Sequence, residues 1–325
     1  MKKLKLIEKS KILSQNIISS MILTMTLSIC LAFITKILCV IFNLPSMSIF
    51  DFILVSFFAG LISSVIMLPL SMLISLKSFQ HGWDPDNITT PLIAAFGDLF
   101  TLPSIILSVL LLSSFHNITV LRNIIAILAV IIAIIGICYG FKSNDKVGTI
   151  VKQSTPVLFI CSILGSISGG ILNSSAETLL SNPSLLTLVP LFSGESGNLV
   201  SILGARLSSG LHLGLIEPSR KPGANALKNF GIILILAIII YPVIGILADS
   251  SSLILGINGV GFLNIATISF LAGMAMIFIM IAVVFNISTI SYRKGLDPDN
   301  IVIPLSTSIT DSISTLMLIV AAMLI

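Results

Sequence analysis

Long apolar runs divide this 325-residue chain into segments that water solvates poorly. A helix needs about 20 apolar residues to cross the ~30 Å hydrocarbon core of a bilayer. Nine runs reach or approach that length, at approximately 17–40, 49–76, 88–115, 121–141, 156–172, 185–215, 230–248, 262–290 and 301–325. Only 9% of the residues are charged, and the mean hydropathy of +1.14 lies outside the range of water-soluble domains. The sequence therefore predicts an all-α polytopic membrane protein of about nine helices, surrounded by the lipid bilayer.

The basic residues indicate how these helices are oriented. With the amino terminus in the cytoplasm, the cytoplasmic segments hold fourteen of the 17 lysines and arginines, as the positive-inside rule requires. These are Lys2, Lys3, Lys5, Lys9, Lys11, Lys77, Lys142, Lys146, Lys152, Arg220, Lys221, Lys228, Arg293 and Lys294. We expect a multi-pass protein of the cell membrane with its carboxyl terminus outside. The basic residues form no continuous stripe, which argues against a nucleic-acid partner.

An internal repeat organises the chain. A constant offset of 213 residues relates Asp84 to Asp297, Pro91 to Pro304 and Asp98 to Asp311. The first three spans therefore correspond to the last three, and both copies cross the membrane in the same direction. A parallel repeat of this kind has a pseudo-two-fold axis along the membrane normal. Equivalent residues of the two copies are then expected to face each other around a central path.

Each copy of the repeat contains an Asp-Pro pair followed by a second proline. Asp84 and Asp297 are typical helix N-caps, and the proline after each one fits the first helical turn. Pro91 and Pro304 would lie inside the helices, where each removes one backbone hydrogen bond. Lipid does not tolerate such a break, so this face of each helix should point toward protein or water.

Asp98 and Asp311 are the strongest candidates for a functional site. Each lies near the middle of a predicted span, where a charged carboxylate costs at least ~2.5 kcal/mol on insertion scales. A protonated aspartate that bonds a neighbouring helix is the alternative reading. Two carboxylates that face each other repel, and a divalent cation between them would remove the conflict. Neither histidine nor cysteine accompanies them, which favours a hard cation bound by oxygen over zinc or copper.

A glycine-rich segment, 188–214, is the other distinctive motif. Pro190, Gly194 and Gly197 would let another backbone approach closely or let the helix unwind, and Asn198 offers an amide as a ligand. An ordinary helix interface made of small residues is the alternative.

Together these motifs resemble a known family. The run Pro-x3-Gly-x2-Gly-Asn, followed by Arg-Leu-Ser, and the twice-repeated Asp-Pro-Asp-Asn-x3-Pro-Leu-x5-Asp are similar to the MgtE magnesium transporters, particularly their two-repeat solute-carrier branch. The resemblance implies a translocation path in which Asp98 and Asp311 bind a largely hydrated Mg²⁺ as the transported ion. It also implies that the backbone carbonyls of Ala94 and Thr307 and the side chain of Asn198 assist.

The sequence departs from that family in two ways. It contains no segment long and polar enough for the large cytoplasmic magnesium sensor that MgtE proteins usually carry. With the offset of 213, the first copy also lacks a counterpart of 155–213. We expect an incomplete first repeat in 1–115, a linking span and cytoplasmic loop in 116–154, and a complete second repeat in 155–325. Three explanations are open for the two missing spans: an upstream start codon, a partner subunit that supplies them, or a lineage-specific reduction.

Two other functional classes fit the sequence less well. A secondary transporter of an organic anion would need cationic or amide-rich groups where this chain has aspartates. An intramembrane aspartyl enzyme would need Gly-x-Gly-Asp-type flanks, which neither Asp98 nor Asp311 has. We therefore expect transport of a divalent cation, with Mg²⁺ the best fit, and no enzymatic activity.

Overall fold

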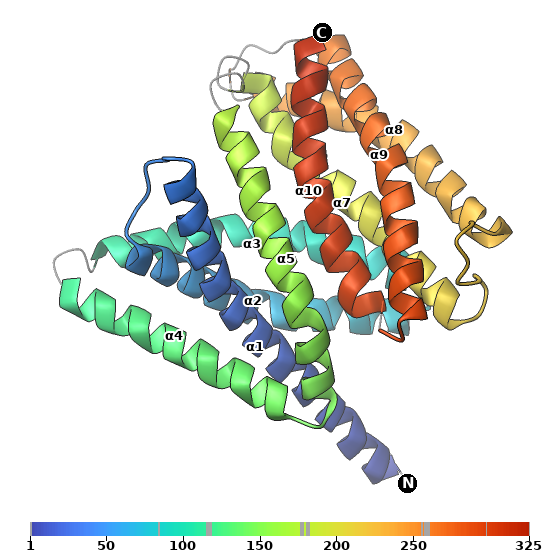
Figure 1. Ribbon diagram of the computed structural model, residues 1–325. Helices are drawn as coiled ribbons and strands as arrows, with labels where there is room; N and C mark the ends of the chain where they lie inside the picture. The colour runs from blue at the N-terminus through green and yellow to red at the C-terminus, as the bar shows by residue number, and fades with distance from the viewer. Residues whose placement is uncertain are drawn as a thin grey trace. The chain divides into compact units, whose positions relative to one another are not determined.

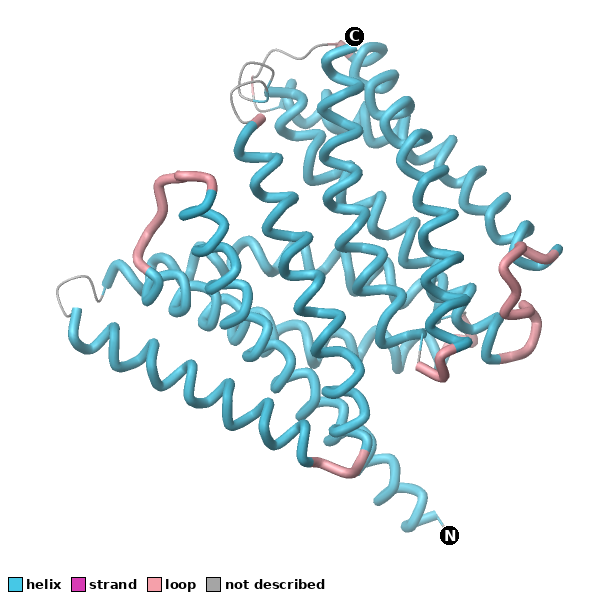
Figure 2. The backbone as a smooth tube through the Cα atoms, in the orientation of Figure 1, coloured by secondary structure: helices cyan, strands magenta, loops and turns pink. Residues whose placement is uncertain are grey.

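The computed structural model describes residues 2–83, 85–114, 119–175, 179, 183–254, 256, 261–296 and 298–324, and the regular secondary structure in these ranges is helical (Figures 1 and 2). The helices are α1 (Lys2–Ile41), α2 (Ile49–Gln80), α3 (Pro85–Ser114), α4 (Thr119–Lys142), α5 (Lys146–Ser174), α7 (Pro183–His212), α8 (Ala224–Ile254), α9 (Phe262–Arg293) and α10 (Pro298–Leu324). Within the described ranges, nine helices are long and apolar enough to cross a membrane, which confirms the predicted spans. The chain is an all-α polytopic membrane protein.

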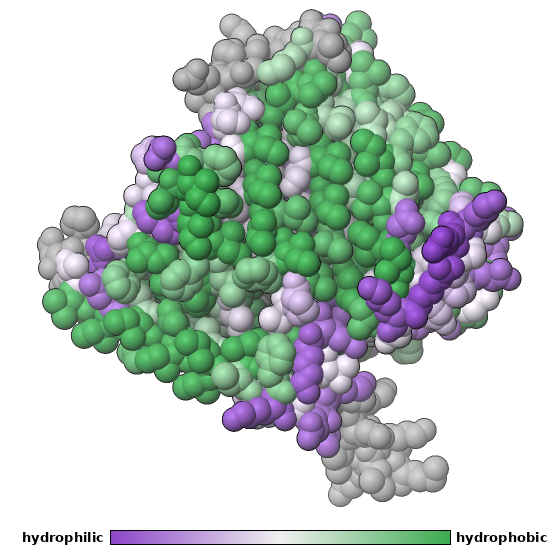
Figure 3. All heavy atoms as spheres, in the orientation of Figure 1, coloured by the Kyte–Doolittle hydropathy of each residue, from purple (hydrophilic) through white to green (hydrophobic). Residues whose placement is uncertain are grey.

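Apolar side chains on the outer surfaces of the helices are exposed, as expected of helices that face lipid. On α4, Ile131 is 44% exposed, Ile134 54% and Ile135 63%. Soluble monomers rarely expose continuous apolar surface of this extent. Figure 3 shows that hydrophobic residues cover the lengths of the helices on the visible face, while hydrophilic residues gather near helix ends and connections.

The chain forms two compact units, one of residues 1–81 and 95–166 and the other of residues 82–94 and 167–325. In the first unit α1, α2 and α4 pack together around Leu54, Phe57 and small alanines of α4 such as Ala129. An ion pair between Asp51 of α2 and Arg122 of α4 lies largely buried at the edge of this core. Small residues on α4 allow close helix contact, which is how helices associate in lipid.

In the second unit α7, α8, α9 and α10 lie side by side (Figure 1). Their shared core is more extensive than that of the first unit and includes Phe192, Tyr241 and Met276, all fully buried. The Tyr241 hydroxyl shares a hydrogen bond of 3.2 Å with Ser196 of α7. The backbone carbonyl of Tyr241 accepts a hydrogen bond of 2.7 Å from Ser269 of α9. Polar contacts of this kind join neighbouring helices where no water is available.

The helix boundaries follow the 213-residue offset found in the sequence. The ranges of α2 and α9 differ by 213 residues at both ends, and so do the first residues of α3 and α10. The glycines after α2 and α9, Gly82 and Gly295, share a left-handed φ of 67°. Both helices that follow begin at the proline of an Asp-Pro pair, as predicted. The expected N-caps Asp84 and Asp297 lie outside the described residues.

Close helix contacts also recur at the same offset. A Cβ added at Gly60 of α2 would collide with the hydroxyl of Ser28 on α1, and one added at Gly273 of α9 would enter the ring of Tyr241 on α8. Gly60 corresponds to Gly273, and Ser28 corresponds to Tyr241. The two copies therefore pack their first helix against their second at equivalent positions. The division of the chain at 115 and 154 stays a prediction.

Several helices extend beyond the predicted spans, and the start of α5 is one of the larger differences. The fifth span was expected to begin near Pro156, yet α5 begins at Lys146. Asp145 explains the longer helix, because its carboxylate accepts hydrogen bonds of 2.9 Å from the Val147 N–H and 3.4 Å from the Gly148 N–H. Donation to this carboxylate, foremost by the Ser143 hydroxyl, holds the pKa of Asp145 below its usual value.

Candidate functional site

Asp311 lies on α10 at the middle of the candidate span that runs from Asn300 to Met323. Its side chain is half-buried. The Ser193 hydroxyl of α7 donates a hydrogen bond of 3.0 Å to Asp311 Oδ1. A carboxylate in a membrane-spanning helix is costly to bury. The structure gives this one a hydroxyl donor from a neighbouring helix.

The backbone at Asp311 is also heavily hydrogen-bonded. Its carbonyl oxygen accepts bonds of 3.1 Å from Ser168 of α5, 3.2 Å from Ser314 and 2.8 Å from Thr315. The Ser314 hydroxyl lies 3.4 Å from that of Ser193. Hydroxyls from α5, α7 and α10 therefore meet at one residue of the second unit. These bonds hold the backbone of α10 at Asp311 against α5 and α7.

Thr307 lies one helical turn before Asp311 and is half-buried. Its hydroxyl donates to the carbonyls of Ile303, at 3.0 Å, and Pro304, at 3.1 Å. Pro304 lies inside α10, as predicted. Because proline has no N–H to donate, α10 lacks one helical hydrogen bond at this point.

Asn198 is on α7 and only 7% exposed. Its amide nitrogen donates to Glu195 Oε2 at 3.3 Å. Its amide oxygen is buried and has no hydrogen-bond partner among the described residues. A buried acceptor without a partner is costly to the folded state. The hydrogen bonds of Asn198 in the described part of the chain involve Glu195 and Ser201, on its own helix, and not Asp311.

The expectation for the glycine motif is wrong in one respect. Residues 183–212 form one continuous helix, so neither Pro190 nor the glycines unwind it. Nor does Gly197 serve close approach, since an added Cβ would meet no described atom within 4 Å. Gly197 follows Ser193 by four residues, so it lies on the same face of α7. Open space therefore adjoins the face of α7 that contacts Asp311.

Asp98 and Ala94 lie on α3, and both side chains are exposed. Ala94 belongs to the second compact unit and Asp98 to the first. Asp311, Thr307 and Asn198 all belong to the second unit. The pairing of Asp98 with Asp311 stays a prediction.

Three residues of this region were missed by the sequence analysis, namely Ser193, Ser168 and Glu195. Glu195 carried the clearest signal, because it is an acidic residue inside an apolar run and lies three residues before Asn198. That spacing places both side chains on one helix face. Ser193 and Ser168 carried little signal, since isolated serines are common in membrane helices and their partners depend on how the helices pack.

Comparison with known proteins gives a consistent result. Residues 1–108 and 189–321 match the sequence profile of the family MgtE, described as a divalent cation transporter. Solute carrier family 41 member 2 is 26% identical over 284 residues in Xenopus laevis and 27% identical over 288 residues in Homo sapiens. Member 3 from Rattus norvegicus is 25% identical over 278 residues.

These alignments cover 81–82% of this chain. They cover 48% of the Xenopus protein, 47% of the human protein and 59% of the rat protein. The chain thus spans about half the length of the member 2 proteins. No solved structure gives a significant match.

Proposed function

Because this chain belongs to the MgtE family of divalent cation transporters, we propose that it carries Mg²⁺ across the cell membrane along a path that passes Asp98 and Asp311. The observation that carries this proposal is the Asp311 carboxylate, located mid-span and bonded to Ser193. An acidic group at that depth is a functional site by default, because lipid strongly disfavours it.

The donors around Asp311 suit a hydrated ion. Mg²⁺ dehydrates reluctantly and usually keeps several waters, so protein oxygens contact it mainly through its water shell. Those waters donate hydrogen bonds, and carboxylate, carbonyl and hydroxyl oxygens accept them. Asp311, the Thr307 carbonyl and the Ser193 hydroxyl provide all three kinds of acceptor. Binding through waters is also weak enough to allow release.

Asn198 and Glu195 form a second polar position along α7. Asn198 follows Ser193 by five residues, which is ~7.5 Å along the helix axis. The unpartnered amide oxygen of Asn198 can accept a hydrogen bond from the water shell of the ion. Glu195 adds negative charge beside it. A hydrated ion that leaves Asp311 would then meet these oxygens next.

The proposed orientation places the amino terminus in the cytoplasm and the carboxyl terminus outside. The distribution of lysine and arginine supports it. In that orientation the α7–α8 connection is cytoplasmic, and Asn198 lies closer to the cytoplasm than Asp311 does.

The proposal also pairs Asp98 with Asp311 as carboxylates of a shared ion site. The 213-residue repeat supports it, since the two aspartates occupy equivalent positions of α3 and α10. Two carboxylates attract a divalent cation more strongly than a monovalent one.

Flux measurements on protein reconstituted in liposomes test the function. Wild-type protein should admit Mg²⁺ to liposomes that contain a magnesium-sensitive dye, and Ser193→Ala should reduce the rate. Ser269→Ala is a matched control, because it also removes a buried hydroxyl of the second unit. That hydroxyl donates to the backbone carbonyl of Tyr241 on α8 and not to Asp311. Mg²⁺ flux that is absent in the wild type, or equal in both serine variants, would oppose the proposal.

A further inference from the structure

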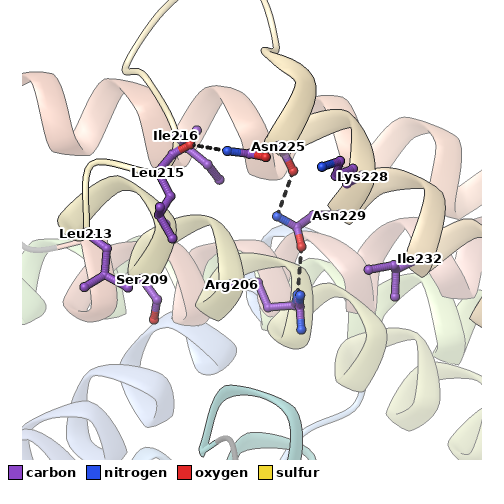
Figure 4. Close-up of a pocket in the computed structure, with 10 residues that line it drawn as sticks. Arg206, Ser209, Leu213, Leu215, Ile216, Asn225, Lys228, Asn229 and Ile232 are labelled. Carbon is purple, nitrogen blue, oxygen red and sulfur yellow. Dashed lines mark hydrogen bonds between the residues drawn. The ribbon is translucent and has the colours of Figure 1, made fainter.

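A pocket lies at the end of α7, beneath the connection that leads to α8 (Figure 4). Its volume is about 650 Å³, within the range of sites that hold small molecules. The last turns of α7, the connection 213–223 and the first turns of α8 form its walls. All of its lining residues belong to the second compact unit, and none of them belongs to the proposed ion site.

A chain of side-chain amides shapes this pocket. Asn225 donates to the Leu215 carbonyl at 2.8 Å, and Asn229 donates to the Asn225 carbonyl at 3.1 Å. The Arg206 Nε donates to Asn229 Oδ1 at 2.8 Å. Figure 4 shows these three bonds in succession, with Arg206 at the end of the series. The connection and α8 therefore hold the guanidinium group in a fixed position, and Arg206 is a positioned group instead of a mobile surface charge.

The charges of the pocket favour an anion. Arg206 and Lys228 are both lining residues, and none of the described residues that line the pocket is acidic. The amino-terminal end of α8, which begins at Ala224, adds the positive end of a 31-residue helix. Arginine beside lysine at such an end is well suited to a phosphate group, because both side chains are cationic hydrogen-bond donors.

Apolar side chains share the pocket with these charges. Leu213 is 73% exposed, Leu215 60% and Ile232 42%. Inorganic phosphate would gain nothing from them, whereas the chains of a lipid would cover them.

The depth of the pocket also fits a lipid. The 30 residues of α7 span ~45 Å, which exceeds the ~30 Å hydrocarbon core and leaves ~7 Å at each end. Arg206 lies six residues before the end of α7, at ~9 Å, and Lys228 lies four residues into α8, at ~6 Å. Both cationic groups therefore lie near the level of the phospholipid headgroups.

From these observations we infer that the pocket binds the phosphate of an anionic phospholipid, with Arg206 and Lys228 as its cationic partners. The acyl chains lie against the exposed leucines and Ile232. Basic pockets between membrane helices commonly hold anionic headgroups. This site is separate from the ion path, so its occupancy is measured without any measurement of transport.

Lipid binding to purified protein tests this inference. The protein is titrated in detergent with phosphatidylglycerol, phosphatidylcholine or inorganic phosphate, and bound lipid is counted by native mass spectrometry. Phosphatidylglycerol should bind, whereas phosphatidylcholine, whose phosphate is balanced by a quaternary ammonium, should bind at least fivefold more weakly. Lys228→Gln should weaken phosphatidylglycerol binding about fivefold, the factor that corresponds to ~1 kcal/mol for one basic residue near an anionic headgroup.

Lys221→Gln is the matched control. Lys221 is an exposed basic residue of the same connection that does not line the pocket, so its loss should leave binding unchanged. Arg206→Gln should weaken binding at least as much as Lys228→Gln. If that variant does not fold, the two lysine variants still decide the outcome, because both residues are exposed.

Three results would overturn the inference. Equal binding of the two lipids would show that charge does not matter. Equal losses in the two lysine variants would indicate general attraction to a basic surface. Displacement of phosphatidylglycerol by millimolar inorganic phosphate would assign the pocket to a soluble phosphate compound.

Discussion

Asp311→Asn removes one negative charge from the proposed ion site and changes little else. Asparagine has nearly the same volume as aspartate, and its amide oxygen can still accept the Ser193 hydrogen bond that is now 3.0 Å long. The fold of α10 should therefore persist. Any change in transport then reports the loss of charge.

The size of the effect can be worked from the geometry of a hydrated ion. A Mg²⁺ contacted through one of its waters lies ~4.5 Å from a carboxylate oxygen, given a Mg–O bond of about 2.1 Å and a hydrogen bond of about 2.7 Å. Charges of +2 and −1 at that distance attract by ~2 kcal/mol in water and by ~7 kcal/mol at an effective dielectric constant near 20. Even the lower value corresponds to a loss of about 30-fold in affinity.

The assay is initial Mg²⁺ uptake into liposomes at ion concentrations below saturation. Asp311→Asn should lower the rate at least ~30-fold relative to the wild type, at equal amounts of reconstituted protein. Asp145→Asn makes the same chemical change at the start of α5, outside the candidate span, and asparagine is an equally good N-cap. This control should transport at the wild-type rate. Wild-type transport by Asp311→Asn would refute the role assigned to this carboxylate.

Three further outcomes are expected. Gly197→Leu should fold normally yet reduce Mg²⁺ uptake severely, because its side chain would fill the open space on the α7 face that contacts Asp311. Gly231→Leu, which is also in open space but on α8, should not reduce uptake, and equal uptake by the two variants would contradict a path along α7. Gly273→Ala should destabilise the protein by ~1–3 kcal/mol, because its new Cβ meets an aromatic ring. It should lower the thermal unfolding temperature in detergent more than Gly60→Ala, whose closest contact would be a serine hydroxyl that can rotate. A tenfold excess of Ca²⁺ should inhibit Mg²⁺ uptake weakly, because Ca²⁺ prefers direct ligation by more oxygens; equal competition would oppose recognition of the hydrated ion.

The sequence was sufficient to predict the spans because lipid imposes one dominant requirement on them. Length and apolar composition identify the part of each helix that lies in hydrocarbon, and all nine predicted spans coincide with helices in the described ranges. Hydropathy gives no information on where a helix ends beyond the lipid. The start of α5 was therefore misplaced, since the Asp145 cap extends that helix by polar residues that an apolar run does not include.

The contacts of the candidate site residues could not be predicted from the sequence. The repeat was enough to select Asp311, because a carboxylate in the middle of an apolar helix is costly. The hydrogen bond from Ser193 to Asp311 depends on how α7 packs against α10. That packing cannot be read from the residues around either position in a single sequence. The unwinding considered for the motif around Gly197 does not occur for a related reason. Backbone in lipid must satisfy its own hydrogen bonds, and a continuous helix does so even with glycine and proline in it.

Equilibrium binding of Mg²⁺ to the purified protein, measured by isothermal titration calorimetry, tests the shared site most directly. Wild-type protein, Asp98→Asn and Asp311→Asn are titrated under the same conditions. If both carboxylates contact one hydrated ion, each substitution must weaken the same binding event, so that neither variant retains it at wild-type affinity. Loss of different binding events in the two variants, or wild-type binding by either one, would contradict a shared site for Asp98 and Asp311.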